Sequence, residues 1–147
     1  MNLWFLFVAL MSGAVAPLQV GINAQLAKLM LHPLQAAVVS FLVGTFGVIV
    51  VSFALRIPMP PASQALQTPP LLLTGGLLGV FMVITAITSA PRLGAAVFIA
   101  ASIAGQMIAS LLLDHYGLLG YAAQPISLLK LLGILLVCAG VFLIRGI

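Results

Sequence analysis

The sequence predicts an all-α integral membrane protein with five transmembrane helices, and three observations carry this prediction. First, 64% of its 147 residues are hydrophobic and only 4% are charged, whereas about 25% of an average soluble domain is charged. Second, the apolar residues form five runs, each close to the length of about 20 residues that a helix needs to cross a bilayer. Third, the charged residues lie at or near the ends of these runs. Open strands would leave backbone groups unpaired in lipid, and no alternating pattern indicates a β-barrel.

We expect one membrane domain, residues 1–147, with helices over about 3–27, 34–55, 71–90, 94–113 and 127–144. The first run ends at Lys28, His32 and Pro33. The second ends at Arg56, where a proline-rich stretch up to Pro70 predicts the longest loop, because proline does not continue a helix.

The remaining connections are shorter. Residues 91–94 predict a very tight third turn, and residues 114–125, which include two glycines, predict the last loop. A cleaved signal peptide is an alternative for the N-terminal segment, since Ala14-Val15-Ala16 has the form of a cleavage site. No Lys or Arg precedes this apolar run, however, and the run is long enough to span the bilayer.

Composition also bears on function. The five cations are too widely spaced to form a nucleic-acid surface, so no nucleic-acid partner is expected. Cys138 is the only cysteine, and the two histidines, His32 and His115, lie in loops assigned to opposite sides of the membrane. With Asp114 they would form a metal site only across an antiparallel dimer. No arrangement typical of an enzyme is visible, and we expect neither a resident metal nor a cofactor.

The loop charges give almost no preference for one orientation in the membrane. Five crossings place Lys28, Arg92 and Arg145 on one side, and Arg56 and Lys130 on the other. Orientation follows the excess of Lys and Arg in short loops, so a near tie predicts copies inserted both ways. Two opposed copies would reproduce the inverted repeat of larger transporters, and we therefore expect an antiparallel homodimer. A parallel dimer or a different membrane partner remains an alternative.

Small residues mark the faces on which the helices are expected to pack, because membrane helices associate through close backbone approach. In the second helix these are Ala36, Ser40, Gly44 and Gly47, and the third helix carries a similar series from Gly75 to Ala90. The fourth carries the ridge Ala101, Gly105 and Ala109. The fifth helix has no strongly polar residue at its centre, so we assign it to dimer contact.

Polar side chains within the first helix are candidates for substrate binding. Ser12, Gln19 and Asn23 share one face. Pro17 removes a backbone donor and Gly21 follows one turn later, which predicts a helix break beside these amides. Interrupted helices of transporters line cavities near the membrane midplane. The alternative is that both amides only hydrogen-bond to a neighbouring helix.

The fourth helix supplies a second candidate wall. Ser102, Gln106 and Ser110 occupy successive turns of one face. At the end of this helix Asp114 precedes His115, and Lys130 opens the fifth helix across the same loop. A local Asp114–Lys130 ion pair is favoured over a proton relay through Asp114 and His115, although these are the candidate groups for any coupling.

Four segments carry a family resemblance: residues 17–24 (PLQVGINA), 37–44 (AVVSFLVG), 105–106 (GQ) and 114–120 (DHYGLLG). Together they resemble the five-helix YdcZ-type branch of the drug/metabolite transporter (DMT) superfamily. The resemblance implies a multi-pass exporter of the bacterial inner (cytoplasmic) membrane, related to ten-helix transporters made of two five-helix halves. It also places five residues among those to test: Gln19, Asn23, Ser40, Gln106 and Asp114.

The sequence thus predicts a small membrane transporter whose first and fourth helices line a polar cavity. Its partners would be the lipid bilayer, a second copy of the chain and a small neutral or amphipathic metabolite or drug. No carboxylate lies deep in any span, which argues against exchange of an organic cation for protons. A dual-topology channel and a non-transporting subunit of a hetero-oligomer are the alternatives.

Overall fold

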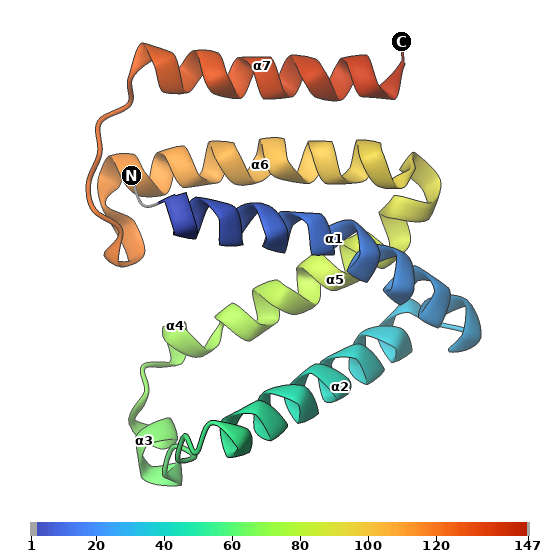
Figure 1. The fold of residues 1–147 in the computed structure, drawn as a ribbon, viewed down its shortest axis with the longest axis vertical. Coiled ribbons are helices and arrows are strands. Elements are labelled where there is room, and N and C mark those ends of the chain that lie inside the picture. The colour runs from blue at the N-terminus through green and yellow to red at the C-terminus, as the bar shows by residue number, and fades with distance from the viewer. Residues whose placement is uncertain (1–2, 147) are drawn as a thin grey trace. The chain divides into compact units, whose positions relative to one another are not determined.

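The computed structural model describes residues 3–146, without the side chains of Ala62 and Ala65, and its regular structure there is entirely helical (Figure 1). The elements are α1 (Leu3–Leu29), α2 (Pro33–Ala54), α3 (Ala62–Gln67), α4 (Pro70–Leu73), α5 (Gly75–Leu93), α6 (Ala95–Tyr116), the 3-10 turn η1 (Leu118–Gly120) and α7 (Leu128–Arg145). Five segments in the described range are long and apolar enough to cross a membrane, with α4 and α5 together forming the third. The predicted all-helical class with five membrane-spanning segments is confirmed.

The chain divides into two compact units, Met1–Pro91 and Arg92–Ile147. In the first unit α1 packs against α2, and the end of α5 completes a small core. The buried members of this core are Ala36, Ala37 and Ile87. Because the two alanines carry only a methyl group, they let the helices approach closely, as small residues do between membrane helices.

The turn between α1 and α2 is held by His32. Its ring Nδ1 accepts a hydrogen bond from the Leu34 backbone N–H at 3.1 Å, which satisfies an amide in the first turn of α2. Pro33 follows as the first helical residue, where its missing N–H costs nothing. Leu31 takes a positive φ of 64°, which reverses the chain just before this cap.

The first helix runs without interruption through both residues that were expected to break it. Pro17 lies inside α1, which is continuous from Leu3 to Leu29, and Gly21 is helical as well. A proline removes one backbone hydrogen bond, and the bonds of the neighbouring turns maintain the helix around it. No unwound backbone is therefore exposed at Pro17 or Gly21 in this structure.

The proline-rich connection and the third turn also differ in detail from the sequence prediction. The short helices α3 and α4 lie within or next to the expected loop. Further on, α5 continues through Pro91 to Leu93, so that Gly94 alone separates it from α6. Gly94 adopts a φ of 86°, a conformation that glycine reaches without steric cost.

In the second unit α6 and α7 lie side by side and antiparallel (Figure 1). Their loop is fixed at both ends. Gly117 closes α6 in the left-handed conformation, and the Gln124 N–H donates to the Asp114 carbonyl at 2.7 Å. Ser127 caps α7, where its hydroxyl accepts from the Lys130 N–H at 3.3 Å.

The small-residue faces predicted for α5 and α6 differ in whether they are buried. Gly79 of α5 meets the Phe41 ring, with 3.6 Å between the ring and the position of an added Cβ, and Ala86 and Ala90 of the same helix are buried. On α6, in contrast, the buried alanine is Ala104, whereas Ala101, Gly105 and Ala109 are exposed. A Cβ added at Gly105 would meet no atom within 4 Å. The predicted ridge of α6 is therefore exposed in this structure.

Candidate functional site

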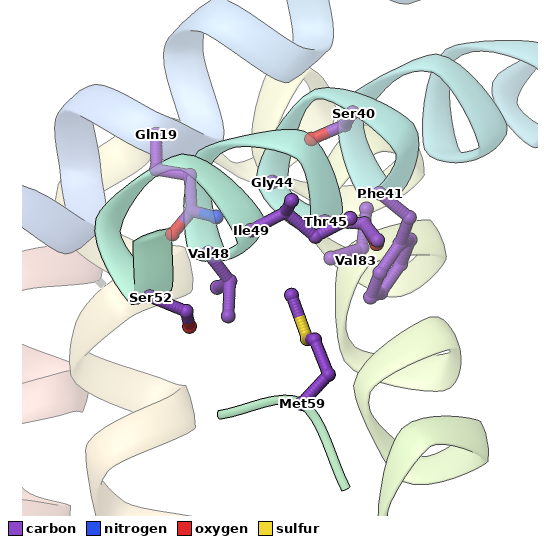
Figure 2. Close-up of a pocket in the computed structure, with 10 residues that line it drawn as sticks. All are labelled: Gln19, Ser40, Phe41, Gly44, Thr45, Val48, Ile49, Ser52, Met59 and Val83. Atoms are coloured by element: carbon purple, nitrogen blue, oxygen red, sulfur yellow. The ribbon is translucent and has the colours of Figure 1, made fainter. Parts of the chain in front are cut away.

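The first unit contains a groove of about 420 Å³ along α2. Its ten lining residues come from α1, α2, the following loop and α5 (Figure 2): Gln19, Ser40, Phe41, Gly44, Thr45, Val48, Ile49, Ser52, Met59 and Val83. The α2 residues dominate because positions 40, 44, 48 and 52 follow one another at one turn each and share a face. In Figure 2 the Met59 side chain reaches from the loop toward this face.

Neutral polar groups are distributed along this otherwise apolar groove. Ser40, Thr45 and Ser52 contribute hydroxyls from α2, and Gln19 contributes an amide from α1. The Gln19 side chain is exposed, and it forms no hydrogen bond with another residue in the described part of the chain. Its amide therefore retains both donor and acceptor capacity for a ligand.

The structure brings together two of the predicted site residues here, Gln19 and Ser40, and adds three that the sequence prediction missed. Thr45 and Ser52 lie seven residues apart on α2, which is about two helical turns, and this spacing was the available signal. Met59 follows a proline in the loop after α2, and no helical periodicity indicates its position.

Asn23 does not line this groove. It lies one turn beyond Gln19 on α1, but it is 6% exposed and is the one polar residue buried in the described part of the chain. Ser12, at the other end of the predicted face, is exposed and also lies outside the groove. Sharing one helix face does not give these three residues a common environment, because the surroundings of α1 change along its length.

A second groove, of about 460 Å³, lies within the other unit between α6 and α7. Its lining residues are Ile103, Gln106, Met107, Ser110, Leu111, Asp114, Lys130, Gly133 and Ile134. Gln106, Ser110 and Asp114 occupy successive turns of α6. Ser102 lies one turn earlier, half-buried, and is not part of the lining.

The charged residues at this end of the groove are not paired as expected. The Lys130 ammonium donates to the side-chain oxygen of Gln124 at 3.0 Å, and no ion pair joins it to Asp114 in residues 3–146. The Gln124 backbone N–H also donates to the Asp114 carbonyl, so Gln124 is held at the end of α6. The predicted local Asp114–Lys130 ion pair is therefore absent from this structure.

His115 points to a different environment from its neighbour. Its side chain is exposed, does not line the groove, and contacts the Tyr116 ring edge-on with 4.8 Å between ring centres. The Asp114–His115 relay thus has no support in the geometry of these side chains. Within the described residues, no group of three or more His, Cys, Asp or Glu is arranged to hold a metal ion.

Each groove can bind a molecule through hydrogen bonds and apolar contact. The first offers one amide and three hydroxyls without any charged side chain. The second adds an acid and an amine.

Comparison with known proteins identifies one family. The family model described as "Putative inner membrane exporter, YdcZ" matches residues 4–143. No curated protein and no solved structure matches the chain.

Proposed function

Since the chain belongs to the YdcZ family of inner membrane exporters, we propose that it exports a small neutral or amphipathic molecule as an antiparallel homodimer. Family membership and five apolar helices make the chain a multi-pass protein of the inner membrane, and a transporter rather than an enzyme. The cargo class and the dimer are inferred from the grooves and the charges.

The groove along α2 is the observation that supports the neutral or amphipathic cargo. Amide and hydroxyl groups cost free energy in hydrocarbon unless they find partners, so their alignment along one groove favours a role in binding. Its polar groups are all uncharged, and the lining also includes Phe41, Val83 and Met59. A molecule with a few hydrogen-bonding groups on an apolar body satisfies both kinds of surface.

The antiparallel dimer is supported by two features. The loop cations are divided almost evenly between the two sides, which favours insertion in both orientations. In addition, Gln19, Gln106 and Ser110 are exposed on membrane-spanning helices. Polar side chains in a bilayer are usually covered by protein or face a water-filled cavity, and a second copy of the chain would provide such a cover.

A flux assay tests the proposed activity. Purified protein is reconstituted in vesicles loaded with a panel of radiolabelled neutral and amphipathic metabolites, and the initial rate of release is measured against concentration. We expect a rate that saturates for at least one compound, because each cargo molecule occupies a binding site. A rate that increases linearly without saturation would instead indicate a channel, and no release above that of empty vesicles would reject the proposal.

Orientation is tested separately from flux. A tag at the C-terminus of the chain is labelled from the outside of intact cells and again after the membrane is opened. The proposal requires that a substantial fraction of the tags is reached on each face. Labelling on one face only would exclude the antiparallel dimer while leaving the transport activity to be judged by the flux assay.

A further inference from the structure

We propose that the groove between α6 and α7 binds a zwitterion, with its ammonium group near Asp114 and its carboxylate or phosphate group near Lys130. This inference rests on the proposed function and deepens it, because a zwitterion is a cargo that is neutral overall. The groove lies entirely within the second unit, which the structure describes up to Gly146.

The groove presents an acid and an amine that leave each other unpaired. Asp114 and Lys130 are both half-buried and line the same groove, yet no ion pair connects them in the described range. The Lys130 ammonium has three donors and uses one of them on Gln124. The Asp114 carboxylate accepts no hydrogen bond from any described residue. Each charge therefore has capacity for a partner of opposite sign.

The unpaired charges of Asp114 and Lys130 favour a ligand that carries both a positive and a negative group. A simple cation would pair with Asp114 and leave Lys130 without a counter-ion in a partly dehydrated groove, and a simple anion would do the reverse. Uncompensated charges are costly in such surroundings. A zwitterion pairs with both residues, so its affinity should exceed that of either analogue with a single charge.

The rest of the lining suits the body of such a molecule. Gln106 and Ser110 lie two turns and one turn before Asp114 on α6 and offer uncharged hydrogen-bonding groups. Ile103, Leu111 and Ile134 supply apolar surface. We infer a compact zwitterion whose charged groups bind at the Asp114 end and whose uncharged part extends toward Gln106.

Two sources share this chemistry: a soluble amino acid and the headgroup of phosphatidylethanolamine. Both combine an ammonium with an anionic group. The experiment therefore starts in a bilayer whose lipids carry no ammonium. Full-length protein is placed in phosphatidylglycerol nanodiscs and titrated calorimetrically with γ-aminobutyrate, butylamine and butyrate, which have the same number of carbons. We expect γ-aminobutyrate to bind at least about tenfold more tightly than either singly charged analogue. Equal binding of the three compounds, or no binding, would overturn the proposal.

Substitutions at Asp114 and Lys130 test which charged group of the ligand each residue binds. Asp114→Asn should bind γ-aminobutyrate only as tightly as the wild-type protein binds butyrate. Lys130→Gln should bind it only as tightly as the wild-type protein binds butylamine. Lys130→Arg keeps the charge and should retain binding, which separates loss of charge from damage to the fold. Arg145→Gln removes a cation from the same helix outside the groove and should leave all affinities unchanged. Unaltered discrimination in both Asp114→Asn and Lys130→Gln would contradict the assignment.

A second titration identifies the source of the zwitterion. In phosphatidylethanolamine nanodiscs, loss of γ-aminobutyrate binding by wild-type protein would show that the lipid headgroup occupies the same charge pair. Retained binding would show that the groove selects the soluble zwitterion. Because these titrations need no flux, they remain informative if the chain fails to transport. Gln19→Leu, in the other groove, should lower flux at least about tenfold and leave this binding intact.

Discussion

Gln19 presents an amide to the groove along α2 without contributing a hydrogen bond to the fold. Replacement by leucine, which has a similar size, should therefore change the free energy of unfolding by no more than about 0.5 kcal/mol. The same replacement removes the only amide of the groove, and we expect export to fall at least about tenfold, the effect of losing roughly 1.4 kcal/mol of binding. Thermal unfolding in detergent and vesicle flux measure the two quantities.

Ser12→Ala is the matched control for this variant, because Ser12 is a polar residue of the same helix that lies outside the groove. It should preserve both stability and export. Wild-type export by Gln19→Leu would remove Gln19 from the substrate path.

The candidate site could be predicted from sequence only where helical spacing decides it. Ser102, Gln106 and Ser110 were predicted on successive turns of one face, and Gln106 and Ser110 line one groove while Ser102 does not. Gln19, also predicted from helical spacing, lines the other groove. Asn23 shares a face with Gln19 but is buried, because periodicity gives a direction around the helix and does not identify what packs there. The predicted Asp114–Lys130 ion pair is likewise not formed among the residues that the structure describes. A backbone hydrogen bond within the loop places Gln124 beside Lys130, and such a bond leaves no signal in the residue types.

At the scale of single elements, the start of α2 depends on a histidine acting as an N-cap. His32→Ala removes the acceptor of the Leu34 N–H, and we expect the free energy of unfolding to decrease by about 1 kcal/mol. His32→Asn supplies an equivalent side-chain acceptor and should recover most of this loss. Thermal unfolding in detergent measures the stability of wild type, His32→Asn and His32→Ala, which should decrease in this order. Gln35→Ala, in the same turn, is the neutral control. Equal stability of His32→Ala and wild type would show that the cap contributes nothing.

The packing of α1, α2 and α5 depends on small side chains at one point. Ala36 is 0% exposed, so leucine at this position would force the helices apart. We expect Ala36→Leu to lower the free energy of unfolding by about 1–3 kcal/mol. Ala54→Leu makes the same chemical change at an exposed position at the end of α2 and should have little effect. A similar unfolding temperature for both variants would argue against this core.

The elements themselves follow from apolar length, which is why five spanning segments could be predicted. Proline was the less reliable signal. Pro17 and Pro91 both lie inside helices, because removal of one backbone donor is tolerated when adjacent turns remain bonded. The ridge of Ala101, Gly105 and Ala109 shows a further limit. Spacing identified a face of small residues, whereas the buried small residue of α6 is Ala104, directly beside Gly105 in the sequence.

For the whole molecule, the near tie of loop cations leads to a prediction about pairs of chains. Arg56→Gln leaves one cation on its side of the membrane, Lys130, against three on the other, whereas Lys28→Gln combined with Arg92→Gln and Arg145→Gln leaves none on that other side against two. Each variant should insert in a single orientation, because the side richer in Lys and Arg stays in the cytoplasm. If export needs two copies in opposite orientations, cells that express either variant alone should not export the substrate. Co-expression of the two variants supplies both orientations and should restore export.

Tag accessibility verifies the orientations and efflux measures the recovery of export. Lys28→Arg, which changes no charge, is the control. Full export by either variant in a single verified orientation would show that one orientation suffices.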